Sequence, residues 1–124
     1  MVKNILIIED DKFLRSLITE KVSSQGFNVS VAIDGKEGIR EAQKSKPDLI
    51  LLDLILPDVD GFEVLSKIKG EAGTSAVPVI VLSNLDSKED IDKALKLGAS
   101  DFLIKAQLTP EEIVEKVKNI FSAK

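Results

Sequence analysis

The sequence predicts an α/β fold, with one parallel five-stranded sheet that is covered by helices on both faces. Two observations support this prediction. Five short segments rich in apolar and β-branched residues recur along the chain, and segments with helical periodicity lie between them. Because most of the five segments are continuously apolar, they are typical of strands buried on both faces. The regular alternation of strands and helices then indicates parallel pairing.

The five strands are expected where these apolar segments lie. Right-handed crossover connections leave few strand orders, and the flavodoxin-like order 2-1-3-4-5 is the commonest at this length. We therefore expect a flavodoxin-like (βα)5 three-layer sandwich with that order. The predicted strands are residues 5–8, 29–32, 49–52, 79–82 and 102–104.

The first four helices are predicted from apolar residues spaced three or four positions apart. In the first helix Leu14, Ile18 and Val22 share one face, and Gly26 is a stop signal. The second helix has the weakest apolar pattern. The predicted ranges are residues 12–25, 35–43, 61–69 and 87–97. The apolar anchors of the last three are Ile39 and Ala42, then Val64, Leu65 and Ile68, then Ile91, Ala94 and Leu95.

The fifth helix is predicted mainly from its first turn. Thr109 is followed by Pro110 at the first helical position, and Glu112 lies three residues after Thr109. This spacing is that of a capping box, in which two side chains satisfy free backbone N–H groups. The apolar anchors that follow are Ile113, Val117 and Ile120.

Length and composition predict one soluble domain, residues 1–124, in the cytoplasm. The chain is 44% hydrophobic and 31% charged, and its apolar runs are far too short to cross a bilayer or to form a signal peptide. It has no cysteine and no histidine, which excludes disulfides, thiolate chemistry and imidazole ligands. A net charge of -4 argues against direct binding of nucleic acid.

Polar residues follow the predicted strands where a parallel sheet places its functional sites. Glu9 and Asp10 follow the first strand, Asp53 the third, Ser83 the fourth and Lys105 the fifth. Three crowded carboxylates repel one another unless a cation neutralises them or their pKa values rise. An all-oxygen site with few protein ligands suits Mg²⁺ better than Ca²⁺.

Each of these residues also has a simpler interpretation. A polar residue after a strand is usually the start of a solvated loop. The Asp10 and Asp11 pair is equally compatible with the N-cap of the following helix. Only the joint pattern favours a site.

Four motifs in this chain resemble those of response-regulator receiver domains. They are Ile-Ile-Glu-Asp-Asp at 7–11, Leu-Leu-Asp-Leu-Ile-Leu-Pro-Asp-Val-Asp-Gly at 51–61, Pro-Val-Ile-Val-Leu-Ser at 78–83 and Gly-Ala-Ser-Asp-Phe-Leu-Ile-Lys at 98–105. They occur in the order of the family and cover nearly the whole chain. The resemblance implies a phosphorylation switch of two-component signal transduction.

The resemblance also implies a role for each site residue. Asp53 matches the phosphoacceptor, which takes a phosphoryl group from a phosphohistidine of a sensor histidine kinase or histidine phosphotransfer protein. Glu9 and Asp10, with Asp53 and the backbone carbonyl of Ile55, match the ligands of Mg²⁺, for which Mn²⁺ is a possible substitute. Lys105 and Ser83 match the residues that contact the phosphoryl oxygens.

Further positions match the switch and the docking surface of the family. Phe102 matches the aromatic residue that turns inward when Ser83 moves, although an ordinary core aromatic is the alternative. The fourth helix, fifth strand and fifth helix would form the output surface for a downstream protein, in a monomer or a phosphorylation-dependent dimer. Phe13 and Leu17 match kinase-docking positions, although Leu17 could instead extend the core.

The sequence departs from the family pattern in three places. Ala106 follows Lys105 where receivers commonly have a cis proline, so we expect a trans bond and a differently aimed lysine. Glu9 replaces the more frequent aspartate. Ile55 and Leu85 occupy positions that tune access of water, and two apolar side chains there predict slow autodephosphorylation. The resemblance also implies that the domain catalyses its own phosphorylation, although it is not a conventional enzyme.

Three alternatives remain open from the sequence. The first is a receiver-fold interaction module that works without phosphorylation, against which the complete acidic set argues. The second is a flavodoxin-like cofactor binder, although no Gly- or Ser/Thr-rich phosphate loop follows the first strand and Trp and Tyr are absent. The third is a metal-dependent hydrolase, for which a second base is missing.

Overall fold

The computed structural model describes residues 2–122 and contains the predicted parallel sheet. The strand order is β2-β1-β3-β4-β5, and every neighbouring pair is parallel, so the predicted topology is confirmed. The predicted domain limits, Met1 and Lys124, lie outside the described residues. The strands are β1 (Asn4–Ile8), β2 (Asn28–Ala32), β3 (Leu49–Leu52), β4 (Val79–Ser83) and β5 (Asp101–Ile104).

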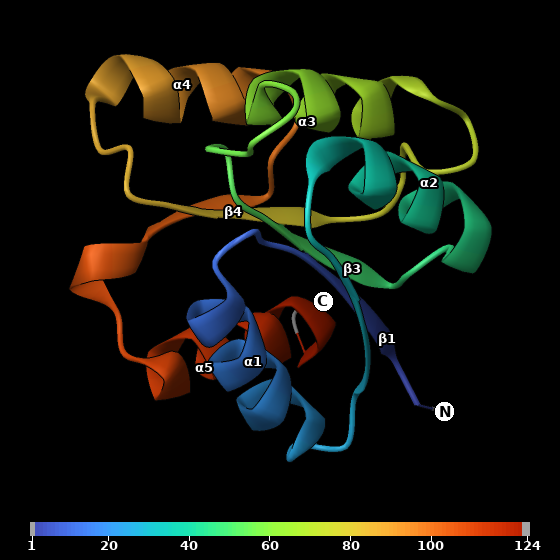
Figure 1. Ribbon diagram of the computed structural model, residues 1–124, viewed down its shortest axis with the longest axis vertical. Helices are drawn as coiled ribbons and strands as arrows, with labels where there is room; N and C mark the ends of the chain where they lie inside the picture. The colour runs from blue at the N-terminus through green and yellow to red at the C-terminus, as the bar shows by residue number, and fades with distance from the viewer. Residues whose placement is uncertain (1, 123–124) are drawn as a thin grey trace.

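Helices cover both faces of the sheet, as Figure 1 shows: α1 and α5 lie on one face, and α2, α3 and α4 lie on the other. A short 3-10 turn after β5 was not predicted. None of the helices in residues 2–122 has the length and apolar character needed to span a membrane. The helices are α1 (Lys12–Ser23), α2 (Gly35–Ser45), α3 (Gly61–Gly70), α4 (Lys88–Lys96) and α5 (Pro110–Ser122), and the 3-10 turn is η1 (Lys105–Gln107).

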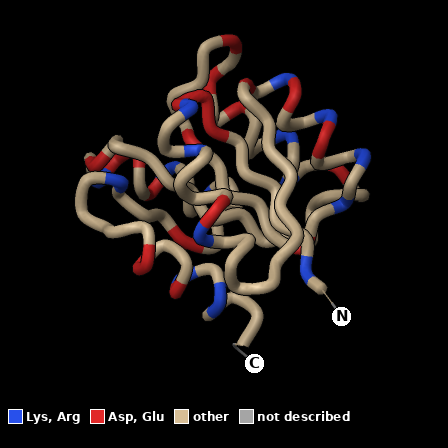
Figure 2. The backbone as a smooth tube through the Cα atoms, turned by 60° about the horizontal axis from the view of Figure 1, so that its bottom comes forward, with Lys and Arg blue, Asp and Glu red and all other residues tan. Residues whose placement is uncertain are grey.

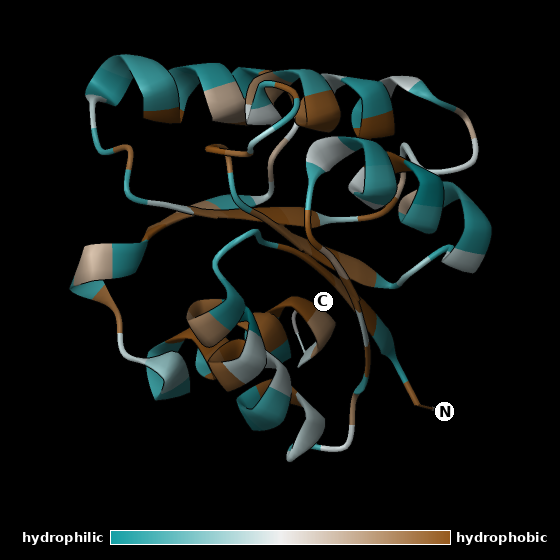
Figure 3. Cartoon of the chain, viewed as in Figure 1, coloured by the Kyte–Doolittle hydropathy of each residue, from teal (hydrophilic) through white to brown (hydrophobic). Residues whose placement is uncertain are grey.

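The central strands are buried on both sides because their residues alternate between two hydrophobic cores. In β1, Leu6 and Ile8 pack in the core under α2, α3 and α4, whereas Ile5 and Ile7 pack under α1 and α5. Strand β3 alternates in the same way. Figure 3 shows the apolar strands between helices whose outer surfaces are mostly hydrophilic. Continuous apolar runs are therefore what this sheet requires.

Side-chain caps fix the helix starts close to the predicted positions. At α5, Glu112 N donates to Thr109 Oγ1 at 3.2 Å and Thr109 N donates to Glu112 Oε1 at 2.9 Å, which confirms the capping box. At α1, Asp11 is the N-cap, because its Oδ1 accepts from Leu14 N at 3.1 Å. The N-cap interpretation therefore holds for Asp11, and Asp10 is left outside the cap.

The limits of the first four helices differ from the predicted ranges by at most two residues, and one residue of α4 was placed on the wrong face. Helix α1 ends at Ser23 rather than residue 25, because the chain turns through Gly26, which has a φ of 93°. In α4, Leu95 is 46% exposed although it was expected on the buried face. Ala94 is buried and Leu97 packs against the same core, so the buried face passes through these two positions and Leu95 lies beside it.

Candidate functional site

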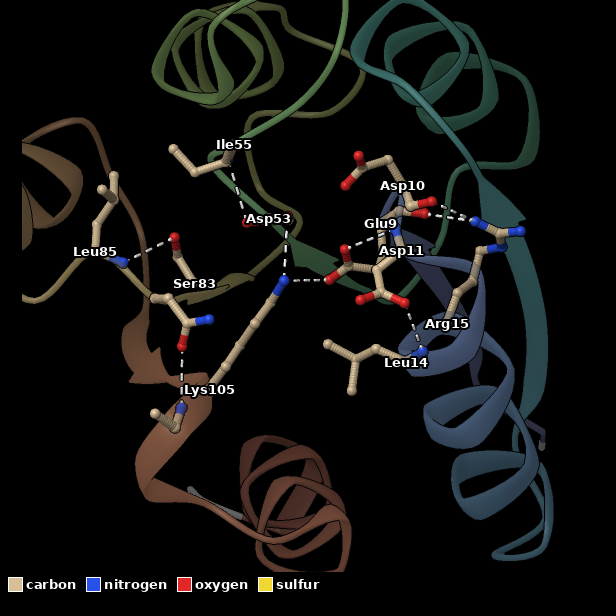
Figure 4. A network of polar contacts seen from close by, with 12 residues as sticks. Glu9, Asp10, Asp11, Leu14, Arg15, Asp53, Ile55, Ser83, Leu85 and Lys105 are labelled. Carbon is tan, nitrogen blue, oxygen red and sulfur yellow. Dashed lines mark hydrogen bonds and ion pairs between the residues drawn. The ribbon is translucent and has the colours of Figure 1, made fainter.

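The predicted site residues meet at the carboxyl edge of the sheet. Glu9 and Asp53 directly follow β1 and β3, and their backbone N–H groups still pair with neighbouring strands: Glu9 N donates to Ala32 O and Asp53 N to Ile8 O, both at 3.0 Å. This pairing fixes where the two carboxylates project. Ser83 ends β4 and is buried, and both carboxylate residues are buried with it. Figure 4 shows the side chains facing one another across this edge.

The ammonium of Lys105 lies between the two buried carboxylates. Its Nζ is 2.7 Å from Glu9 Oε1 and 3.1 Å from Asp53 Oδ2, and the lysine side chain is only 15% exposed (Figure 4). Burial alone lowers the pKa of Lys105. The hydrogen bond with Glu9 and the negative charges of Asp53 and Glu9 outweigh that effect and raise the pKa above its ordinary value. The lysine is therefore fully charged near neutral pH.

Burial perturbs the carboxyl group of Glu9 strongly. Burial raises its pKa to about 7, and the charge of Asp53 acts in the same direction, against the hydrogen bonds from Lys105 and from the Asp11 backbone. Its Oε2 accepts from Asp11 N at 3.1 Å. Apart from the ion pair with Lys105, Oε1 has no hydrogen-bond partner in residues 2–122. A carboxylate oxygen has more than one acceptor site, so Oε1 can bind a metal ion in addition to the ammonium.

The acidic residues of the cluster fit a divalent metal ion. Glu9, Asp10 and Asp53 each offer a carboxylate oxygen, and these oxygens lie within 4.8 Å of one another. Asp10 is exposed, so the cluster opens toward solvent on one side. A small set of carboxylate oxygens that opens toward solvent suits a hard divalent cation, which keeps some of its bound water molecules.

The remaining predicted residues line the same edge. Ile55 N donates to Asp53 Oδ1 at 3.2 Å, and the Ile55 side chain is 58% exposed. Ser83 Oγ accepts from Leu85 N at 3.3 Å. The Lys105–Ala106 bond is trans, as are all peptide bonds between residues 2 and 122, and the ammonium nevertheless reaches both carboxylates.

The predicted switch and docking residues lie outside this cluster. Phe102 is half-buried and packs against the core under α2, α3 and α4. At the start of α1, Phe13 is 80% exposed, and Leu17 is half-buried one turn later. Phe13 is too exposed for a core residue, which agrees with a surface role.

Sequence reasoning missed two residues that hold the loops around the site. Arg15 Nη1 donates to the carbonyl oxygens of Glu9 and Asp10 at 3.0 and 3.3 Å, so α1 holds the acidic loop in place. Asn84 Oδ1 accepts from Ala106 N at 3.1 Å. Arg15 lies four positions after the N-cap, and Asn84 directly follows a predicted site residue, but no sequence pattern marks their contacts with the backbone of another loop.

A third missed residue, Asp58, connects the loop after β3 to α2. Its Oδ1 accepts from the N–H groups of Gly35 and Val59 at 2.8 Å, and its Oδ2 accepts from Lys36 N at 3.0 Å. These hydrogen bonds, above all that from Lys36, lower the pKa of Asp58. Its carboxylate is therefore committed to a structural contact and is not available to the acidic cluster.

Comparison with known proteins identifies the family. The response regulator receiver domain family matches residues 5–118. The alkaline phosphatase synthesis transcriptional regulatory protein PhoP of Bacillus subtilis is 34% identical over 97% of this chain and 49% of its own length. The chain thus spans about half the length of such curated relatives.

Solved structures show the same fold. A CheY-like response regulator receiver domain protein from Methanospirillum hungatei superposes with a TM-score of 0.91, at 26% identity, over 98% of this chain and 95% of its own. The phosphorylated cyanobacterial phytochrome response regulator RcpA gives a TM-score of 0.85 at 29% identity, over 99% of this chain and 96% of its own. The family match, the strand order and the acidic cluster agree, and this chain belongs to the response regulator receiver domain family of two-component systems.

Proposed function

We propose that this receiver domain takes a phosphoryl group onto Asp53 from the phosphohistidine of a sensor histidine kinase or histidine phosphotransfer protein. The observation that carries the proposal is the position of Asp53 beside an ammonium and within a three-carboxylate cluster. An oxygen of Asp53 would attack phosphorus while the bond from phosphorus to the donor nitrogen breaks. The donor histidine must lie outside these 124 residues, because they contain none.

Charge neutralisation is the main requirement of phosphoryl transfer. Lys105 would supply a fixed positive charge to the phosphoryl oxygens, and Ser83 would supply a hydroxyl donor. Glu9, Asp10 and Asp53, with the backbone carbonyl of Ile55, would hold Mg²⁺, with Mn²⁺ as a substitute. When bound, the cation would neutralise further negative charge on the transferred group. The family relationship to phosphorylated RcpA supports this assignment.

Phosphorylation would switch the surface formed by α4, β5 and α5. The new phosphoryl oxygens would draw the Ser83 hydroxyl inward, and the half-buried Phe102 on β5 would follow it. A downstream protein would bind the altered surface. Identical backbone chemical shifts there with and without a phosphoryl mimic would contradict the switch.

Acetyl phosphate provides the direct test of the phosphoacceptor. The wild-type protein, Asp53→Ala and Asp10→Ala are incubated with acetyl phosphate, with Mg²⁺ or with EDTA, and analysed by intact mass spectrometry. We expect wild type to gain one phosphoryl group only with Mg²⁺, Asp53→Ala to gain none, and Asp10→Ala to react slowly. Asp11→Ser is the matched control, because it changes the neighbouring acid and keeps an N-capping side chain. Equal labelling of Asp53→Ala and wild type would refute the proposal.

A further inference from the structure

The turn that carries Lys105 is held by a side chain from another loop. The 3-10 turn η1 begins at Lys105 and has no side-chain cap of its own from Ile104. Its closing hydrogen bond, from Leu108 N to Lys105 O, is long at 3.4 Å. The first N–H groups of such a turn have no partner inside it. Asn84 satisfies one of them, because its Oδ1 accepts from Ala106 N at 3.1 Å.

This hydrogen bond continues the pairing of β4 with β5 beyond the end of the sheet. The last paired residues of the two strands are Ser83 and Ile104. Asn84 and Lys105 are the next residue on each strand, where backbone pairing has ended. A side-chain oxygen thus links the segment after Ser83 to the turn that starts at Lys105.

Asn84 also lines the same pocket as the acidic cluster. That pocket is bordered by residues Glu9, Asp10, Asp11, Asp53, Ile55, Asn84 and Lys105. The Asn84 side chain is exposed, so it does not serve to fill the hydrophobic core. Lys105 must cross the ends of β4 and β3 to reach Glu9, and a long flexible side chain does so reproducibly only if its backbone is fixed.

We propose that Asn84 is a positioning residue, which fixes the Lys105 backbone so that the ammonium lies between Glu9 and Asp53. Asn84 acts through Lys105 and does not touch the transferred group. Its effect on phosphorylation rests on the function proposed above, whereas its effect on the lysine does not. Loss of the Asn84 oxygen would release the turn and let the ammonium move away from the carboxylates.

The experiment compares Asn84→Leu, which has a similar size and no acceptor, with Asn84→Asp, which keeps an acceptor oxygen. We expect Asn84→Leu to speed exchange of the Ala106 amide proton and to lower the ¹⁵N order parameter of the Lys105 ammonium. Asn84→Asp should keep both values near those of wild type. The exposed ammonium of Lys88, which pairs with Asp92, is the internal control and should not change. An equally ordered Lys105 ammonium in Asn84→Leu would overturn the proposal.

A double-mutant cycle tests whether the effect passes through Lys105. We expect Asn84→Leu to slow phosphorylation by acetyl phosphate about tenfold in the wild-type background, since small displacements of catalytic groups have effects of this size or larger. In a Lys105→Met background the same substitution should have no further effect. An equal loss in both backgrounds would refute positioning through the lysine. If wild type is not phosphorylated at all, the proposed function fails, and the ammonium order parameter still decides the role of Asn84.

Discussion

Lys105 Nζ lies 2.7 Å from Glu9 Oε1, although the strands that precede the two residues are not neighbours in the sheet. Strands β3 and β4 lie between β1 and β5, so the lysine side chain spans two strand ends. The same ammonium also contacts Asp53 Oδ2, which follows the end of β3. One cation therefore balances two buried carboxylates, and this balance leads to the first two predictions.

Replacing Lys105 with methionine should destabilise the metal-free protein. Two buried carboxylates would lose their only ammonium partner within the described residues, and leaving a buried charge unpaired costs about 3 kcal/mol or more. Mg²⁺ should recover part of this loss, so its stabilising effect should be larger in Lys105→Met than in wild type. Urea denaturation at about pH 8, above the Glu9 pKa of about 7, with and without Mg²⁺ measures both quantities.

Lys88→Met is the matched control for the lysine substitution. Its ion pair with Asp92 is exposed, and exposed pairs contribute about 0 to 1 kcal/mol. The control should therefore unfold like wild type at every Mg²⁺ concentration. Similar losses in Lys105→Met and Lys88→Met would show that the ammonium does not balance the carboxylates.

The stability of the metal-free protein should fall between about pH 4.5 and 7 because of Glu9. The folded protein holds a proton on Glu9 up to about pH 7, whereas the unfolded chain releases it near the ordinary glutamate pKa of 4.5. The folded state therefore binds more protons in this window, and the free energy of unfolding decreases as pH rises through it. Chemical denaturation across this range in EDTA tests the prediction.

Glu9→Gln isolates this contribution from other titrating groups. Glutamine cannot ionise, so the difference in unfolding free energy between wild type and variant should decline over the same window and then level off. Asp53 and Lys105 remain in both proteins. A constant difference from pH 4.5 to 8 would exclude Glu9 as the source of the pH dependence.

The phosphorylated protein should lose its phosphoryl group slowly, and Ile55→Asn should accelerate the loss. Ile55 is 58% exposed and its backbone N–H donates to Asp53 Oδ1, and an apolar side chain at this position cannot hold an attacking water molecule by a hydrogen bond. An amide there could hold that water, and we expect hydrolysis to be about tenfold faster, equivalent to about 1.4 kcal/mol of activation free energy. Ile55→Val is the control, since it stays apolar. Equal decay of all three proteins after removal of acetyl phosphate would contradict the prediction.

Phe13→Ala should slow phosphoryl transfer from a partner kinase without changing the rate of phosphorylation by acetyl phosphate. Phe13 is 80% exposed and does not belong to either core, so its loss should leave the fold intact. A large exposed aromatic residue is typical of a binding surface. We expect transfer from the phosphorylated kinase to fall about tenfold, and Leu17→Ala to have a smaller effect.

Leu95→Ala provides the control for docking. Leu95 is another exposed apolar residue, but it lies on α4, on the other side of the sheet from α1. Its substitution should not change transfer from the kinase. If Phe13→Ala slowed acetyl phosphate and kinase reactions by the same factor, the residue would act on the site and not on docking.

The strands and most helices could be predicted because burial and capping leave local signals. Residues 49–52 are continuously apolar because both faces of β3 are covered, and Thr109 with Glu112 marks the start of α5. Leu95 was wrongly predicted to lie on the buried face of α4, because it is adjacent to the buried Ala94. A helix of nine residues has too few apolar positions to show how wide its buried face is. The turn η1 was missed because it has no apolar periodicity.

The members of the site could be predicted, but their contacts could not. Strand ends and family motifs placed Glu9, Asp53 and Lys105 at one edge. Which oxygen meets the ammonium depends on side-chain conformations, and the trans bond after Lys105 still allows both ion pairs. Arg15 and Asn84 were missed because each acts on backbone atoms of another loop, and no sequence pattern describes such a contact.

The alternation of β1 and β3 between two cores has a consequence for folding. Every residue of 5–8 and 49–52 is apolar, so hydrophobicity would tolerate sliding of one strand past the other by a residue. Such a slip would pull Glu9 or Asp53 into a dry interior, where an unpaired carboxylate is strongly disfavoured. We therefore expect the same acids that form the cluster to disfavour misaligned pairing of β1 and β3 while the chain folds. Figure 2 shows the acidic segments spread over the outer parts of the backbone, with long uncharged stretches between them.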